Sequence, residues 1–88
     1  MKLKGEFILR TLQDDIVAIP VGHTALELNG MVLLNDVSKV IWQCLASDCQ
    51  LSQIVTAVTD AFEVTAEEAE ADILEYLNKL RDAGLLEE

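Results

Sequence analysis

GMVLLNDVSKVIW, residues 30–42, joins a short apolar strand directly to a helix. The uninterrupted apolar run from Met31 to Leu34 predicts a strand that is either buried on both faces or leaves one face for a partner. Asn35 or Asp36 can cap the helix that follows. No nucleophile with a base, no metal-ligand spacing and no glycine-rich phosphate loop accompanies this segment. The sequence therefore predicts a strand edge and a groove rather than a catalytic centre.

Two further strands are predicted before it. Phe7–Leu12 and Ile16–Val21 are apolar runs separated by the turn residues 13–15, a pattern that favours a hairpin. Pro20 cannot donate to a ladder, so it marks an edge or the end of its strand. A connection of residues 22–30 ends on Asn29-Gly30, a pair that favours a turn. Because a helix follows residues 31–34, this third strand should lie at or near the edge of the sheet.

Three helices are predicted after Leu34, each with apolar side chains at helical spacing. The stripes are Val37, Val40, Ile41, Cys44 and Leu45, then Leu51, Ile54, Val55, Val58 and Phe62, then Ala66, Ala69, Ile73, Tyr76, Leu77, Leu80 and Ala83. A capping box at residues 65–68 fixes the start of the third helix, and Gly84 suits a left-handed C-cap. The predicted fold class is α+β, a winged helix-turn-helix with a three-stranded antiparallel sheet followed by three helices, in a single domain of residues 1–88.

Charge is distributed unevenly along the chain. The formal net charge is −10, and residues 60–88 contain ten acidic residues against Lys79 and Arg81. Nucleic-acid binding depends on neutralising phosphates, so this surface argues against a nucleic-acid partner. The acidic stretch is interpreted either as a solvated helix face or as a surface that steers a basic partner.

Cysteine and histidine are scarce. Cys44, Cys49 and His23 are the only residues of these types, too few for a zinc site. Cys44 lies on an apolar stripe and is interpreted as a core residue, whereas Cys49 falls in a connection and can be a free thiol. His23 is interpreted as an ordinary loop residue. The sequence predicts no catalytic residue, no metal and no cofactor.

No targeting signal stands out. The basic start MKLK is followed by Gly5 and Glu6, where a signal peptide needs an apolar run. No segment approaches the roughly 18 apolar residues of a membrane span. With no disulfide framework implied, we expect a cytoplasmic protein with no membrane partner.

The order of these elements resembles the PqqD-like family, whose type member is the pyrroloquinoline quinone biosynthesis protein D. The resemblance extends from about Phe7 to Leu86 and rests on VLLNDVSKVIW, QLSQIVTAVTDAFEVT and DILEYLNKLRDAGLL. Its most specific part is the strand ending in Leu34-Asn35, with Ile41-Trp42 in the following helix.

The resemblance implies a non-enzymatic recognition element for ribosomally synthesised and post-translationally modified peptides. Such a module binds the leader of a precursor peptide and presents it to a modifying enzyme, often a radical SAM enzyme. The leader is expected to add as a strand beside residues 31–34, in a groove against the helix of residues 66–83. The implied peptide-binding residues are Met31, Val32, Leu33, Leu34, Asp72, Ile73, Tyr76, Leu77 and Leu80.

Residue spacing adds independent expectations about these side chains. Val32 and Leu34 share one face of the strand and are expected in the core, whereas Met31 and Leu33 point to the opposite face. Ile73 centres the apolar arc of its helix, with Tyr76 about 60° to one side and Leu77 about 40° to the other. One of these two shoulders can border a groove, and the spacing leaves open which. Trp42 is interpreted as a residue that covers the core.

Three other functions remain to be weighed. A winged-helix DNA-binding regulator shares the fold, but its recognition helix needs basic residues, and the third helix here is acidic. A structural subunit of a maturase complex is a further alternative, which only a search for binding partners would separate from peptide recognition. An enzyme is disfavoured because the chain offers one histidine and little room for a pocket.

Overall fold

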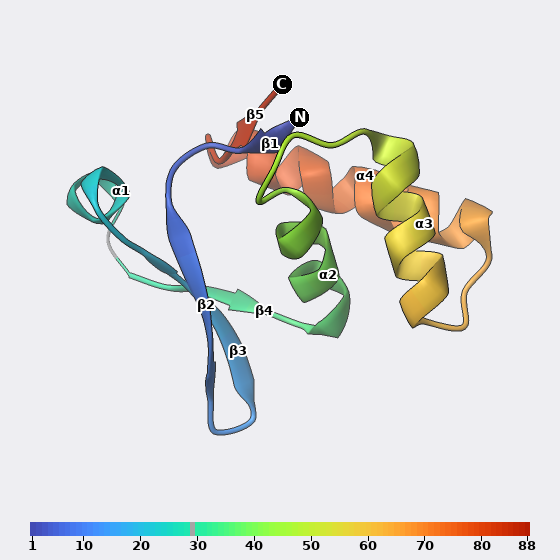
Figure 1. Ribbon diagram of the computed structural model, residues 1–88, viewed down its shortest axis with the longest axis horizontal. Coiled ribbons are helices and arrows are strands. Elements are labelled where there is room, and N and C mark those ends of the chain that lie inside the picture. Colours follow the sequence, from blue (N-terminus) through green and yellow to red (C-terminus); the bar gives the residue numbers. More distant parts are fainter. Residues whose placement is uncertain (29) are drawn as a thin grey trace.

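The computed structural model describes residues 1–28 and 30–88 and places a small sheet beside a set of helices (Figure 1). The elements in chain order are β1 (Lys2–Leu3), β2 (Phe7–Leu12), β3 (Asp15–Pro20), α1 (His23–Glu27), β4 (Val32–Leu34), α2 (Asp36–Cys44), α3 (Leu51–Ala61), α4 (Ala66–Asp82) and β5 (Leu86–Glu87). The predicted α+β class, with its three-stranded antiparallel sheet, is confirmed.

The main sheet has the strand order β2-β3-β4, and both of its pairings are antiparallel. β2 and β3 form the predicted hairpin, in which Leu12 pairs with Asp15 across a two-residue turn. Gln13 takes φ 57° in that turn, the backbone twist that tight hairpin turns require. The strand order leaves β2 at one edge and β4 at the other.

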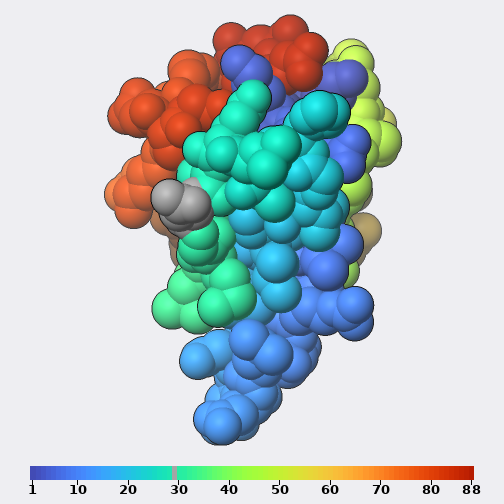
Figure 2. Space-filling view, turned by 90° about the vertical axis from the view of Figure 1, so that its left-hand side faces the viewer, coloured from blue at the N-terminus to red at the C-terminus, as the bar shows by residue number. Residues whose placement is uncertain are grey.

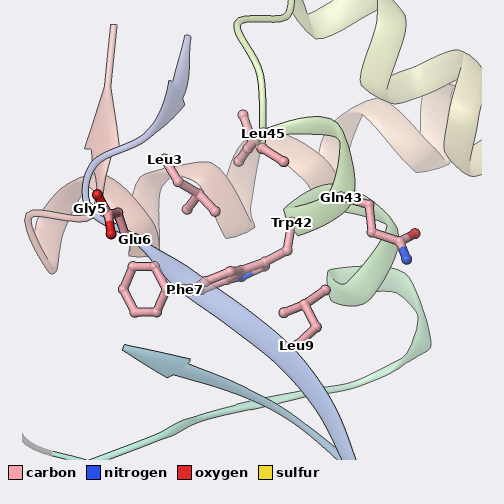
Figure 3. Close-up of a pocket in the computed structure, with 9 residues that line it drawn as sticks. Leu3, Gly5, Glu6, Phe7, Leu9, Trp42, Gln43 and Leu45 are labelled. Carbon is pink, nitrogen blue, oxygen red and sulfur yellow. The ribbon is translucent and has the colours of Figure 1, made fainter. Parts of the chain in front are cut away.

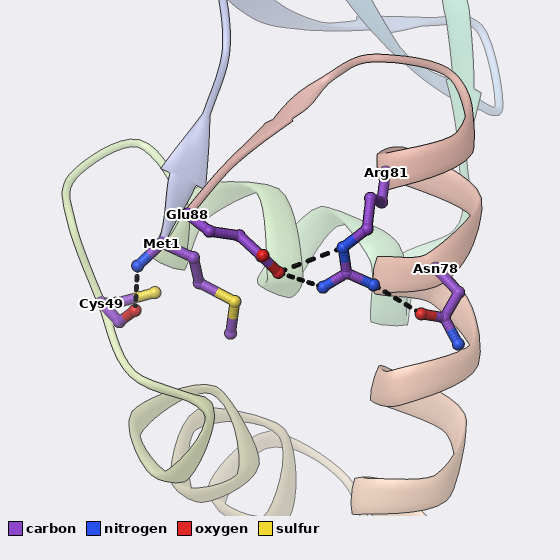
Figure 4. Close-up of polar contacts among 5 residues, drawn as sticks. All are labelled: Met1, Cys49, Asn78, Arg81 and Glu88. Carbon is purple, nitrogen blue, oxygen red and sulfur yellow. Dashed lines mark hydrogen bonds and ion pairs between the residues drawn. The ribbon is translucent and has the colours of Figure 1, made fainter.

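A second, two-stranded sheet was not predicted. β1 and β5 pair antiparallel and bring the two ends of the described chain together. The Leu3 amide also donates to the Leu45 carbonyl at 3.0 Å, and the Lys4 amide donates to the Leu85 carbonyl at 2.8 Å. Figure 4 shows the same region, where Arg81 contacts both Glu88 and Asn78. The hydrogen bond from Leu3 to Leu45 holds β1 against the end of α2.

The structure also corrects the prediction that residues 22–30 are a loop. His23–Glu27 form the short helix α1, so four helices are described rather than three. α1 buries no residue, so it has no apolar stripe from which periodicity could reveal it. The predicted turn at Asn29-Gly30 falls partly outside the described residues, because residue 29 is not described; Gly30 has φ 93°.

The ends of the other helices follow the predicted capping signals. Asn35 caps α2 by accepting from the Ser38 amide, and Ser38 accepts in return from the Asn35 amide, both at 2.8 Å. Thr65 caps α4 by accepting from the Glu68 amide at 3.1 Å. Gly84 ends α4 with φ 75°, as a left-handed C-cap requires.

The core lies between the inner face of the sheet and helices α2, α3 and α4. Its largest fully buried side chains are Trp42, Ile41, Leu45, Ile54 and Ile73. Cys49 lies in its connection as a free thiol, as predicted, but it is buried, whereas Cys44 packs against the core and is only half-buried. Among the described residues, none of the helices has the length and apolarity that crossing a bilayer requires.

Candidate functional site

β4 presents an open main-chain edge, and the sheet register fixes which of its groups face outward. The Val21 amide donates to the Glu6 carbonyl at 3.0 Å, one step beyond the Phe7–Pro20 pair of the β2–β3 ladder. Main-chain groups alternate in direction along a strand, so odd-numbered residues of β3 bond to β2 and even-numbered ones face β4. Pro20 is even-numbered, so its main chain faces away from β2. The β2–β3 ladder therefore loses no hydrogen bond because Pro20 lacks an N–H.

The same alternation then orients β4. Ile16 pairs with Leu34 and Ala18 with Val32, and these pairs exchange hydrogen bonds because Ile16 and Ala18 face β4. Leu33 lies opposite Val17, which bonds to β2 instead. The N–H and C=O of Leu33 therefore point away from the sheet, where an added strand could pair with them.

The side chains of this segment follow the predicted alternation. Leu34 is 5% exposed and belongs to the core, and Val32 is half-buried against it. Leu33 is 69% exposed and Met31 56% exposed. Met31 precedes β4, which begins at Val32 rather than at residue 31 as predicted. Large apolar side chains exposed at this level beside an unpaired edge are a common feature of partner surfaces.

A hollow lies where β4 passes into α2, between that junction and α4. Its volume is about 210 Å³, and its walls are Asn35, Val37, Ser38, Ile41, Asp72 and Tyr76; we call it the α2–α4 hollow. In Figure 2 the green of β4 and the start of α2 lies on the same side of the molecule as the orange of α4. The open edge and the hollow thus belong to one face.

On α4, the structure resolves which shoulder of the helix borders this hollow. Leu77 is 2% exposed and packs inward, whereas Tyr76 is half-buried and lines the hollow. The Tyr76 hydroxyl accepts a hydrogen bond from Trp42 Nε1 at 2.8 Å. Trp42 itself is 1% exposed, as expected of a residue that covers the core.

The nine residues implied for peptide binding therefore divide into two groups. Leu34, Ile73, Leu77 and Leu80 have side chains buried in the core. Met31, Val32, Leu33, Asp72 and Tyr76 have exposed or half-buried side chains, and Val32 and Tyr76 among them also pack against the core. Only the second group can offer side chains to a ligand without repacking the core.

The exposed face of α4 is strongly acidic. Glu67, Glu68, Glu70, Asp72, Glu75 and Asp82 are all exposed. Lys79 reaches Glu75 at 3.9 Å, a surface pair of small energetic value. Asp72 is the one of these six that lines the hollow, so this wall is suited to basic rather than acidic ligands.

Two kinds of reactive group, metal clusters and thiolates, can be examined in the part of the chain that the structure describes. The described residues include no group of three or more His, Cys, Asp or Glu residues placed to hold a metal ion. Burial raises the pKa of the Cys44 thiol, and it is also the main cause of the raised pKa of the Cys49 thiol. Both cysteines therefore stay as thiols near neutral pH, and thiols are poor nucleophiles.

A larger pocket, which the sequence did not predict, lies beside the other edge of the sheet (Figure 3). Its volume is about 410 Å³, and its lining is Leu3, Gly5, Glu6, Phe7, Leu9, Trp42, Gln43, Leu45 and Ala46; we call it the β2 pocket. Phe7 meets Trp42 edge to face, with ring centroids 4.9 Å apart. Only the alternation of Phe7 with Leu9 hinted at this pocket, and alternation alone does not identify the helix that closes it.

Comparison with known proteins gives one family and one structure. Residues 22–86 match the family PqqD, described as coenzyme PQQ synthesis protein D. Among curated proteins, none matches the chain significantly. A solved structure described as TbiB1 in complex with the TbiA(beta) leader peptide has a similar fold, with a TM-score of 0.73 and 23% identity over 99% of this chain and 95% of the other.

Proposed function

Because this chain belongs to the PqqD family, we propose that it is a non-catalytic module that binds the leader of a ribosomally made precursor peptide and presents it to a modifying enzyme. The observation that carries the proposal is the outward-facing main chain of Leu33 at an unpaired edge beside the α2–α4 hollow. Support also comes from TbiB1, a protein of similar fold in complex with a leader peptide.

Binding would proceed by strand addition. An extended leader beside β4 would pair with the N–H and C=O of Leu33, and its alternate side chains would point to opposite faces of the extended sheet. Those on the inner face would reach the α2–α4 hollow, where Asp72 and Tyr76 contribute selectivity. Those on the outer face would pass Met31 and Leu33, whose apolar side chains are exposed.

The buried residues implied for the site would support it through core packing. Leu34, Ile73, Leu77 and Leu80 hold β4 and α4 in place through the core and do not contact the leader in this proposal. Chemistry would come from a separate enzyme, such as a radical SAM maturase. The DNA-binding alternative is disfavoured because the exposed face of α4 carries six acidic side chains.

An NMR titration with synthetic leader peptides, drawn first from any short precursor genes beside this one, tests the proposal. The amide signals of residues 30–35 and 70–81 should shift or broaden, whereas those of α3 (Leu51–Ala61) should change little. Shifts confined to α3, or none with a leader known to be processed by the neighbouring enzyme, would refute strand addition at β4.

Leader binding should weaken as salt increases, because Asp72 lines the α2–α4 hollow and Glu75 is exposed one helical turn further along α4. Asp72→Asn should lower the affinity roughly twofold to fivefold at low salt and flatten the salt dependence. Glu63→Gln is the matched control, since Glu63 is exposed in the connection between α3 and α4. Calorimetry over a salt series measures both, and equal slopes for Asp72→Asn and wild type would exclude Asp72 from the site.

A further inference from the structure

β2 forms the second open edge of the sheet, and no described strand pairs with it on that side. Alternation along the ladder turns the main-chain groups of Phe7, Leu9 and Thr11 away from β3, since Arg10 and its even-numbered neighbours bond to β3. β2 has six residues, compared with three in β4. Edges of this length are usually protected by charged side chains, proline or a bulge, and of these β2 has only Arg10.

The β2 pocket adds a second, independent observation. Its walls come from β1, β2, α2 and the residues next to them, with none from β3, so it lies between α2 and the β2 end of the sheet's inner face. Phe7 and Leu9 contribute both open main-chain groups and side chains that line this pocket. A strand added to β2 would therefore place its inner-face side chains beside an apolar space next to Trp42.

We propose that the β2 edge and the β2 pocket form an interface between two copies of this chain, paired antiparallel about Leu9. In this register Leu9 meets Leu9 of the second copy, and Phe7 meets Thr11. The outward N–H and C=O groups of Phe7, Leu9 and Thr11 in one copy then bond to those of Thr11, Leu9 and Phe7 in the other. The edge is therefore complementary to itself.

The charges near β2 permit this pairing. Arg10 is the only charged residue in β2, and the register sets it opposite Ile8 rather than opposite another arginine. In Figure 2 the blue of β2 and the orange of α4 lie on opposite sides of the molecule. The acidic faces of α4 in the two copies thus stay apart, and their repulsion is reduced.

Pairing through β2 leaves β4 open at each end of the continuous sheet. The inference therefore goes beyond leader binding and does not rest on it. The interface is small by the standard of stable complexes, so association should be reversible and dependent on concentration.

Sedimentation velocity and amide hydrogen exchange on the full chain test this pairing. The weight-average mass should rise from the monomer value of 9.7 kDa toward twice that value as concentration increases. The amides of Phe7, Leu9 and Thr11 should become protected over the same range, whereas the amide of Leu33 should not. A mass that stays at 9.7 kDa at every concentration would overturn the proposal.

Two proline variants separate this interface from the leader site. Leu9→Pro removes an outward N–H and should abolish the rise in mass, while Leu33→Pro should leave that rise intact. If Leu9→Pro does not fold, amide hydrogen exchange of the wild type at several concentrations still shows whether β2 pairs with a second copy. Protection of β2 amides only after addition of the modifying enzyme would assign this edge to that enzyme and refute self-pairing.

Discussion

Leu33→Pro is expected to lower the affinity for a leader peptide roughly tenfold to a hundredfold. The variant lacks the Leu33 N–H, so a carbonyl of the bound leader is removed from water without gaining a hydrogen-bond donor. The N–H of Leu33 points away from β3, so the variant keeps every bond of the β3–β4 ladder. Proline is tolerated on an edge strand when its nitrogen faces solvent. Circular dichroism should therefore show a folded domain, and calorimetry with the leader measures the loss of affinity.

Two matched substitutions make this result specific to the main chain. Val32→Pro removes an N–H that bonds to Ala18 of β3, and it should lower the free energy of unfolding by about 1–3 kcal/mol more than Leu33→Pro does. Leu33→Thr keeps the N–H and the strand propensity, so its effect on affinity isolates the side chain. If Leu33→Thr weakens binding as much as Leu33→Pro, the leader contacts the Leu33 side chain without pairing to its main chain.

Sequence patterns identified the elements that have an apolar stripe or a capping signal. Asn35, Thr65 and Gly84 marked helix ends correctly, and the parity of residues 31–34 separated Leu34 in the core from the exposed Leu33. These signals are local, because each depends on residues within one or two turns of each other.

What the sequence did not reveal depends on long-range packing. β1 pairs with β5 from the opposite end of the chain, and two-residue strands leave no periodicity to detect. Tyr76 and Leu77 lie at similar angles from Ile73, so only the position of α2 decides that Tyr76 borders the hollow. The β2 pocket is missed for the same reason, since Phe7 and Trp42 meet only through the tertiary fold.

Trp42 connects the two surfaces described above. Its ring packs against Phe7 in the β2 pocket, and its Nε1–H donates to Tyr76 at the wall of the α2–α4 hollow. It is also the largest fully buried side chain of the domain. Trp42→Ala should thus lower the free energy of unfolding by about 3–5 kcal/mol, a large part of the 5–15 kcal/mol typical of a whole domain. Denaturant unfolding followed by circular dichroism measures this loss.

The hydrogen bond to Tyr76 can be separated from the packing of Trp42 by a double-mutant cycle. Tyr76→Phe leaves the Nε1–H of buried Trp42 without its partner and should cost about 1–3 kcal/mol. Trp42→Phe removes that donor, so Tyr76→Phe should cost about 0.5–1.5 kcal/mol less in its background. Equal costs in both backgrounds would show that this bond adds nothing to stability. A positive coupling would mean that the Tyr76 side of the hollow is held in place by the core, ready for a ligand before one binds.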